Sequence, residues 1–202
     1  MVYAIVQIMA TTRARMLDST ALLLRERGVG GVTVDAVLAH SGAPRGSVYH
    51  HFPGGRNQLL LEALAQSGAF VSDRLDRAVA AGDASAAVAA FVAFWRRALV
   101  ESEFRAGCPV VAVAVDSRPD VPETADTVRA VFDRWHEQLA RLLRADGYPA
   151  ERAETLATTT VSAIEGAIIL SRARQDVAPL DHVGAELANL LDRSATPNRR
   201  RP

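Results

Sequence analysis

The chain has 202 residues, 49% of them apolar, and is therefore long enough and apolar enough to bury a sizeable core. Its 23 basic residues, all of them arginine, balance 23 acidic ones. No apolar run approaches the ~18 residues that a membrane span requires, and the opening MVYAIVQIMA lacks the basic segment and cleavage pattern of a signal peptide. The composition predicts a cytoplasmic globular protein with no membrane partner.

The charge is distributed unevenly along the chain. Residues 1–66 contain six arginines against four acidic residues, whereas residues 67–196 contain fourteen arginines against nineteen acidic residues. A mildly basic front and an acidic body indicate that a polyanion meets the front. The single cysteine, Cys108, cannot form an internal disulfide, and we expect it to be a buried small hydrophobe rather than a redox sensor.

Helical patterns begin near the N-terminus. In TTRARMLDSTALLLRERG, apolar residues recur at helical spacing from Met16 to Leu24, and this pattern predicts a helix over residues 13–28. Thr11 or Thr12 can cap its start, and the glycine at its end stops it. One face of this helix is therefore expected to be buried.

Two short helices are predicted next. Thr33 is a plausible N-cap for a helix over residues 34–41, and Gly42 allows the chain to turn after it. Pro44 stands where the following helix begins, because the first helical position tolerates a missing N–H. The sequence PGG at residues 53–55 then breaks the chain again.

The rest of the chain also reads as helical. A long amphipathic helix is predicted over residues 56–81, and VVAVAV is interpreted as a buried helical turn because a lone strand would have no partner. Further helices are predicted over residues 84–103, 123–146, 150–174 and 180–193. The sequence therefore predicts an all-α fold of about nine helices.

The stretch GAPRGSVYHHFPGGR, residues 42–56, admits two interpretations. The adjacent His50 and His51 suggest a metal or catalytic cluster, but neighbours on a helix point to different sides, and no Cys, Asp or Glu lies between Asp35 and Glu62. No metal, cofactor or catalytic residue is therefore expected. Two short helices joined by a glycine turn instead follow the helix-turn-helix plan for the DNA major groove.

Apolar and polar residues separate within these two short helices. The residues expected to lock the helices together are Val34, Val37, Val48 and Phe52. The residues then left pointing outward are Arg45, Gly46, Ser47, Tyr49 and His50. Such an outward set suits phosphates and base edges better than a plain solvated face.

The segment TVDAVLAHSGAPRGSVYHHFPGGRNQL, residues 33–59, resembles the DNA-binding segment of TetR-type transcriptional regulators. The helix over residues 13–28 matches the first helix of that fold. PRGSVYHHFPGGR, together with the later GCPVVAVAVD, is most similar to the LmrA and YxaF branch. The resemblance implies an all-helical homodimer with an N-terminal three-helix helix-turn-helix domain, and a larger helical domain for ligand binding and dimerisation.

The resemblance also implies roles for single residues. Arg45 and Ser47 match groove-facing positions, whereas Tyr49 and either His50 or His51 match positions that contact phosphate. An arginine replaces the usual lysine at position 56, and Pro44 replaces a usual serine. The candidate DNA-binding residues are Thr33, Pro44, Arg45, Gly46, Ser47, Tyr49, His50, His51 and Arg56.

Four segments are expected along the chain. Residues 1–11 form a disordered N-terminal arm, with Met1 or Met9 as the true start, and residues 12–55 form the helix-turn-helix DNA-binding domain. Residues 56–195 form the effector-binding and dimerisation domain, and residues 196–202 form a disordered basic tail.

The body supplies candidates for two further sites. A pocket between helices would draw on its aromatic and few polar residues: Phe70, Phe91, Phe94, Trp95, Phe104, Cys108, Phe132, Trp135, His136 and Glu165. Small and apolar residues that allow close helix approach are candidates for a four-helix dimer interface: Thr159, Ser162, Ala163, Gly166, Ala167, Val183, Leu187, Leu190 and Leu191. In the competing interpretation, both sets are simply internal core.

These expectations describe a ligand-responsive repressor that binds a palindromic double-stranded operator as a homodimer and is released by a small hydrophobic or aromatic effector. The alternative is a helical DNA-binding regulator without a small-molecule effector. An enzyme is disfavoured, because the sequence shows no nucleophile with its base, no phosphate loop and no metal-ligand set.

Overall fold

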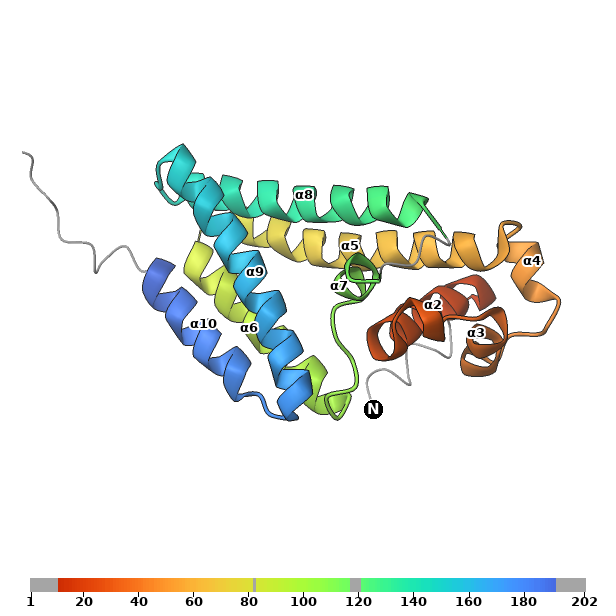
Figure 1. The fold of residues 1–202 in the computed structure, drawn as a ribbon. Helices are drawn as coiled ribbons and strands as arrows, with labels where there is room; N and C mark the ends of the chain where they lie inside the picture. Colours follow the sequence, from red (N-terminus) through yellow and green to blue (C-terminus); the bar gives the residue numbers. More distant parts are fainter. Residues whose placement is uncertain (1–10, 82, 117–120, 192–202) are drawn as a thin grey trace, which may run out of the picture. The chain divides into compact units, whose positions relative to one another are not determined.

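The structure of the chain is a computed structural model that describes residues 11–81, 83–116 and 121–191 (Figure 1). Over these residues it contains nine α-helices, one 3-10 turn and no strand, which confirms the predicted all-α fold. In chain order the elements are α2 (Thr12–Arg27), η1 (Val29–Gly31), α3 (Val34–Ser41), α4 (Ser47–His51), α5 (Gly55–Ala81), α6 (Ala84–Glu101), α7 (Pro109–Ala114), α8 (Glu123–Ala145), α9 (Ala150–Arg174) and α10 (Ala178–Leu191).

The ends of α2 follow from its flanking residues. The Thr11 hydroxyl accepts a hydrogen bond from the Ala14 N–H at 3.2 Å, so Thr11 caps the helix, and Gly28 ends it with φ of +68°. The predicted apolar face is confirmed, because all its members are buried: Met16, Leu17, Thr20, Leu23 and Leu24. Thr11, the last residue of the predicted arm 1–11, instead caps α2; residues 1–10, with both candidate starts, and the predicted tail 196–202 lie outside the described residues.

Three helix boundaries within the described residues differ from the predictions by more than one residue. The recognition helix α4 begins at Ser47 and not at Pro44, because the Pro44 carbonyl accepts the Ser47 N–H at 2.9 Å and closes a turn before the helix. Helix α6 ends at Glu101 because the backbone turns left-handed two residues later. Helix α10 begins two residues early, where the Asp176 carboxylate accepts the Ala178 N–H at 3.1 Å.

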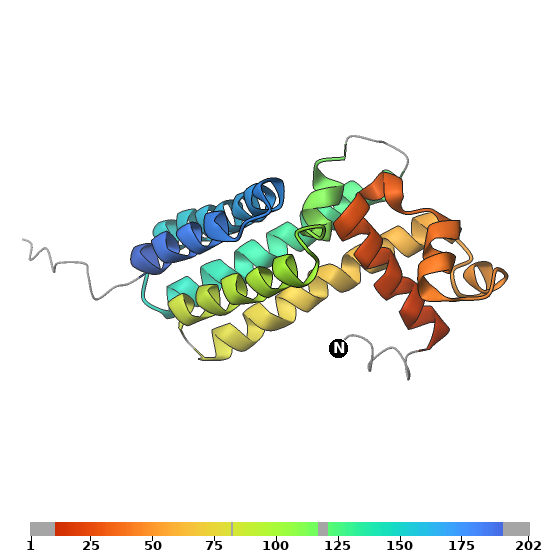
Figure 2. The same cartoon turned by 90° about the horizontal axis from the view of Figure 1, so that it is seen from below.

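The chain forms two compact units. The first comprises Met1–Val71 and Ala106–Asp133, and the second comprises Ser72–Arg105 and Arg134–Pro202. In the first unit, both α3 and α7 pack against α2. In the second, α10 packs against α6 and α9, and Figures 1 and 2 show α9 and α10 side by side. Helices α5 and α8 each run from one unit into the other, and the predicted domain boundary after residue 55 stays a prediction.

The second unit is held together by close helix contact. A Cβ at Gly184 of α10 would lie 3.0 Å from the Val92 Cγ1 of α6, so a larger residue there would require the Val92 side chain to shift. Trp95, Leu99 and Ile168 are among its buried side chains. None of the helices in the described part of the chain combines the length and the apolarity needed to span a lipid bilayer.

Candidate nucleic-acid interface

Buried apolar side chains fix α4 against the rest of the first unit. Val37, Val48 and Phe52 are fully buried, as predicted. Val34 is only half-buried, because it is the first residue of α3. Since Val48 lies inside α4 and Phe52 follows its last residue, both ends of this short helix are anchored, and Tyr49 and His50 are left exposed.

The outward face matches the prediction except at Ser47. Arg45, Gly46 and His50 are exposed, and Tyr49 is 65% exposed. Ser47 is half-buried, and its hydroxyl donates to the Pro44 carbonyl at 2.6 Å. A hydroxyl held in this way stabilises the turn before α4 instead of pointing outward.

The two histidines occupy different environments. His50 is exposed, whereas His51 is half-buried, and their rings meet edge to face with centroids 4.8 Å apart. This difference separates the two residues that the sequence pattern left equivalent.

Tyr49 lies against the start of α5. Gly55 has φ of +60°, and a Cβ at this position would lie 3.3 Å from the Tyr49 Cε1. The left-handed backbone and the close ring both favour glycine here. Gly55 therefore allows α5 to begin directly beneath the exposed tyrosine.

Arg56 faces the protein with two of its donors. Its Nε donates to the Val32 carbonyl at 2.6 Å, and its Nη2 donates to the Val29 carbonyl at 2.9 Å. Arg56 thereby ties the first turn of α5 to η1 and to the residue that follows it. A phosphate at this position could therefore be contacted only by the other N–H groups of the Arg56 guanidinium and by the backbone N–H groups at the start of α5.

Thr33 caps α3. Its hydroxyl accepts the Ala36 N–H at 3.1 Å, and its side chain is exposed. The cap alone explains a threonine at this position, and the predicted phosphate contact requires a separate test.

Replacing Thr33 with alanine is expected to lower the free energy of unfolding by about 1 kcal/mol, because the N–H of Ala36 loses its acceptor. Thr33→Ser should retain the cap and most of the stability. Urea unfolding followed by circular dichroism measures both. If Thr33→Ala leaves stability unchanged but weakens binding to specific and scrambled duplexes alike, Thr33 contacts phosphate instead.

The predicted pocket residues lie in both compact units. Phe70, Cys108 and Phe132 belong to the first, and the remaining seven belong to the second: Phe91, Phe94, Trp95, Phe104, Trp135, His136 and Glu165. The cysteine is buried, as expected, and Phe70 is 43% exposed.

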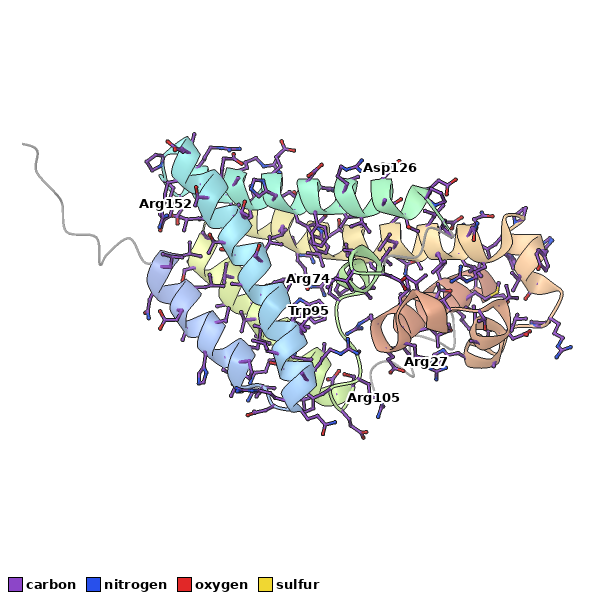
Figure 3. All side chains as sticks on the ribbon, viewed as in Figure 1. Arg27, Arg74, Trp95, Arg105, Asp126 and Arg152 are labelled. Atoms are coloured by element: carbon purple, nitrogen blue, oxygen red, sulfur yellow. The ribbon has the colours of Figure 1, made fainter. Side chains whose placement is uncertain are left out.

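The aromatic residues of α6 form a cluster in the second unit. The Phe94 ring centroid lies 5.3 Å from that of Trp95 and 6.4 Å from that of Phe91. The Arg74 guanidinium of α5 stacks over Phe94 at 5.0 Å, and Figure 3 labels both Arg74 and Trp95. Burial, and next the charge of Arg77, lower the pKa of Arg74. Periodicity along α5 gave no signal for this arginine, because its aromatic partner lies on another helix.

His136 joins two helices. Its Nε2 lies 3.0 Å from the Thr158 hydroxyl and 3.1 Å from the Glu154 carbonyl, and its Nδ1 lies 3.5 Å from the Glu154 carboxylate. These contacts link α8 to α9, so helix packing accounts for His136 without a ligand.

The predicted dimer-interface residues divide into two groups. Three are buried inside the second unit and are unavailable to a partner: Ala167, Leu187 and Leu191. The others are exposed or half-buried: Thr159, Ser162, Ala163, Gly166, Val183 and Leu190. The candidate interface therefore narrows to the second group.

One face of α9 is uncharged along five turns, and its residues are exposed except for the half-buried Gly166. Ile169 is 50% exposed and Leu170 is 55% exposed, and neither was among the predicted interface residues. We call this surface the α9 outer face; its members are Thr155, Thr159, Ser162, Gly166, Ile169, Leu170 and Ala173. A solvated helix face normally carries charges, so an uncharged one is unusual. The spacing of these residues is visible in the sequence, but it does not show which side of α9 is exposed.

Comparison with known proteins agrees with this geometry. Residues 16–63 match the N-terminal profile of bacterial regulatory proteins of the tetR family, and residues 84–186 match the C-terminal domain profile of LmrA/YxaF-like transcriptional regulators. An HTH-type transcriptional regulator of Mycobacterium tuberculosis is 44% identical over 184 residues, which cover 89% of this chain and 93% of that protein. The chain belongs to the TetR family of bacterial transcriptional regulators. The resemblance inferred from residues 33–59 is confirmed.

Other TetR-family proteins align over nearly their whole length. The HTH-type transcriptional regulator LmrA of Bacillus subtilis is 27% identical over 183 residues, covering 90% of this chain and 97% of LmrA. A regulatory protein TetR from Rhodobacter sphaeroides shares the fold with a TM-score of 0.79, 21% identity, and coverage of 89% of this chain and 98% of that one. The relatives are transcriptional regulators, which confirms that the chain is not an enzyme.

One solved relative contains DNA. It is a cysteine mutant of the TetR-family regulator CifR complexed with 26-bp double-strand operator DNA, and it has a TM-score of 0.71 and 25% identity. The alignment covers 88% of this chain and 95% of the CifR chain. The TetR-family chain described here therefore carries the DNA-binding domain of its family at residues 16–63.

Proposed function

We propose that this regulator is a ligand-responsive repressor that acts in the cytoplasm and binds a palindromic operator as a homodimer. The observation that carries the proposal is the exposed set Arg45, Tyr49 and His50, presented by α4 and by the turn directly before it, with α4 anchored on the buried Val48 and Phe52. A rigid helix end with outward cationic and hydroxyl groups suits the major groove.

Each exposed group has a proposed role. Arg45 reads a guanine through paired hydrogen bonds, and Tyr49 and His50 contact phosphates. A Cβ at Gly46 would meet no atom within 4 Å, so a larger residue there would project from the surface and hold α4 away from the groove. The first backbone N–H groups of α5, beside Arg56, offer a further phosphate contact.

The proposed homodimer rests on the α9 outer face. An exposed, uncharged face with small residues at its centre allows a second copy of the same helix to pack closely. Together with Leu190 of α10, which is 40% exposed, this face supports a four-helix interface.

The proposed effector is small and hydrophobic or aromatic. Its support is the aromatic cluster of α6, and the match of residues 84–186 to LmrA/YxaF-like regulators. An effector that binds the released state more tightly by about 1–3 kcal/mol would lower operator affinity 5- to 150-fold.

A gel shift on the DNA that flanks the gene tests the proposal. The protein should form a salt-sensitive specific complex with one duplex, and some aromatic compounds should both raise the melting temperature and dissociate the complex. The absence of any specific complex at low salt would refute DNA-binding repression. A specific complex that no compound dissociates would instead favour a regulator without an effector.

A further inference from the structure

The loop that follows α4 is held by side chains that lie outside the proposed DNA-contacting set. We call residues Phe52–Gly55 the α4–α5 turn. Within it the Phe52 N–H donates to the Val48 carbonyl at 2.6 Å, and the Gly55 N–H donates to the Phe52 carbonyl at 2.8 Å. Phe52 therefore joins the end of α4 to the beginning of α5, directly after Tyr49, His50 and His51.

Arg13, in the first turn of α2, contacts this turn through an aromatic ring. Its guanidinium lies over the Phe52 ring, 4.9 Å from the centroid. The Phe52 side chain is fully buried, and the Arg13 guanidinium covers one face of its ring. A cation over an aromatic face contributes about 0.5–1 kcal/mol at an exposed site and more when water is excluded.

Arg13 reaches the same turn by a second route. Its Nη2 pairs with one carboxylate oxygen of Glu62, and the other oxygen of Glu62 accepts from the Gln58 Nε2 at 2.8 Å. The Gln58 Oε1 in turn accepts the Gly54 N–H at 3.0 Å. A continuous chain of hydrogen bonds thus runs from α2 through α5 to the α4–α5 turn.

We propose that Arg13 and Glu62 are positioning residues, which hold the α4–α5 turn and thereby the DNA-facing side of α4 without touching DNA. An isolated surface ion pair contributes only about 0–1 kcal/mol to stability. Here, however, both routes end on the turn that sets the direction of α4. The pair therefore matters more for the orientation of α4 than for the stability of the fold. This inference rests on the proposed role of α4 in DNA binding.

Glu62→Gln gives the sharpest test, because two effects on DNA affinity have opposite signs. Removing a negative charge from the unit that meets a polyanion tightens DNA binding by electrostatics alone. Weakening the link to the α4–α5 turn loosens specific binding. We expect the specific affinity to fall about tenfold, whereas the affinity for a scrambled duplex stays unchanged or rises.

The matched control is Asp18→Asn, which makes the same charge change on α2. Asp18 also links α2 to α5, because its carboxylate accepts the Gln66 Nε2 at 2.9 Å, but this bond does not reach the α4–α5 turn. Asp18→Asn should therefore leave specific binding unchanged or tighten it.

Arg13 variants separate positioning from direct contact. Arg13→Gln should weaken specific binding with no change in the slope of affinity against salt, whereas loss of a phosphate contact would reduce the slope by about 0.9 for each contact. Arg13→Lys keeps the charge beside Glu62 but loses the planar face over Phe52, so it should recover part of the affinity. Combining Arg13→Gln with Glu62→Gln should cost little more than either change alone.

Fluorescence anisotropy measures the DNA affinity of each variant. The duplex retained in the gel shift is compared with a scrambled duplex of equal length, at a temperature well below the melting temperature of each variant. A reduced salt slope for Arg13→Gln, or unchanged or tighter specific binding by Glu62→Gln, would overturn the inference alone. If Arg13→Gln fails to fold, Glu62→Gln still tests the inference, because this change preserves the size and shape of the side chain. If the wild-type protein retains no duplex in the gel shift, that result would instead refute the proposed function, and this inference would fail with it.

Discussion

If the subunits pair through the α9 outer face as proposed, Gly166→Arg is expected to yield a monomer with at least about 100-fold lower operator affinity, because the second DNA-binding unit is then no longer tethered to the first. A Cβ at Gly166 would meet no atom within 4 Å in one chain, so the position opens toward free space where the arginine side chain begins. Replacing a glycine inside a helix also favours the helix by about 1 kcal/mol. The variant should therefore be at least as stable as the wild type, yet unable to pack its α9 outer face against a second copy.

Sedimentation equilibrium measures this effect, with Ala90→Arg as the control. Ala90 is exposed on α6, outside the α9 outer face, and the variant adds the same side chain there. Ala90→Arg should remain dimeric and bind the operator normally. A Gly166→Arg protein that sediments as a dimer would show that the subunits pair through another surface.

Phe52→Ala is expected to destabilise the DNA-binding unit by about 3–5 kcal/mol, the usual cost of removing a buried aromatic ring. Phe52 has no solvent exposure, so its loss leaves a cavity in the interior, and it also removes the surface on which Arg13 lies. Specific DNA binding should be abolished together with the packing of α4.

The stability measurement must follow the unfolding of the first unit, which contains α4. Both tryptophans, Trp95 and Trp135, belong to the second unit, so their fluorescence does not follow the unfolding of α4. Hydrogen exchange of peptides from α2 to α4 does. Phe52→Leu keeps most of the volume and should cost less than about 1.5 kcal/mol. Equal exchange protection of α2–α4 in Phe52→Ala and wild type would contradict the assigned core role.

Local signals in the sequence were sufficient for most of the fold. Helix α9 has the bounds that its pattern predicts, and Thr33 and Gly42 begin and end α3 as expected, because caps and left-handed turns depend on neighbouring residues. The start of α4 was misplaced for the same reason: a proline is compatible both with the first helical position and with the turn that the Ser47 hydroxyl closes.

The candidate sites depended on contacts between distant residues, which one sequence does not reveal. Arg13 and Glu62 are 49 positions apart, and Arg56 binds carbonyls 24 and 27 positions earlier. Along α9, Gly166 and Ala167 are equally small, but only the structure shows that Ala167 faces the core and Gly166 the surface. Side-chain direction within a packed unit is therefore what residue type and spacing could not supply.

The central claim, that the exposed Arg45 in the turn before α4 reads base sequence, is tested most directly by selecting bound sites from random DNA. Wild-type protein and Arg45→Ala should be used in parallel. The wild type should enrich a palindrome with half-sites about one helical turn apart, and Arg45→Ala should lose preference at one base pair in each half-site while still binding DNA. Recovery of the same motif by both proteins, with equal preference at every position, would contradict the account.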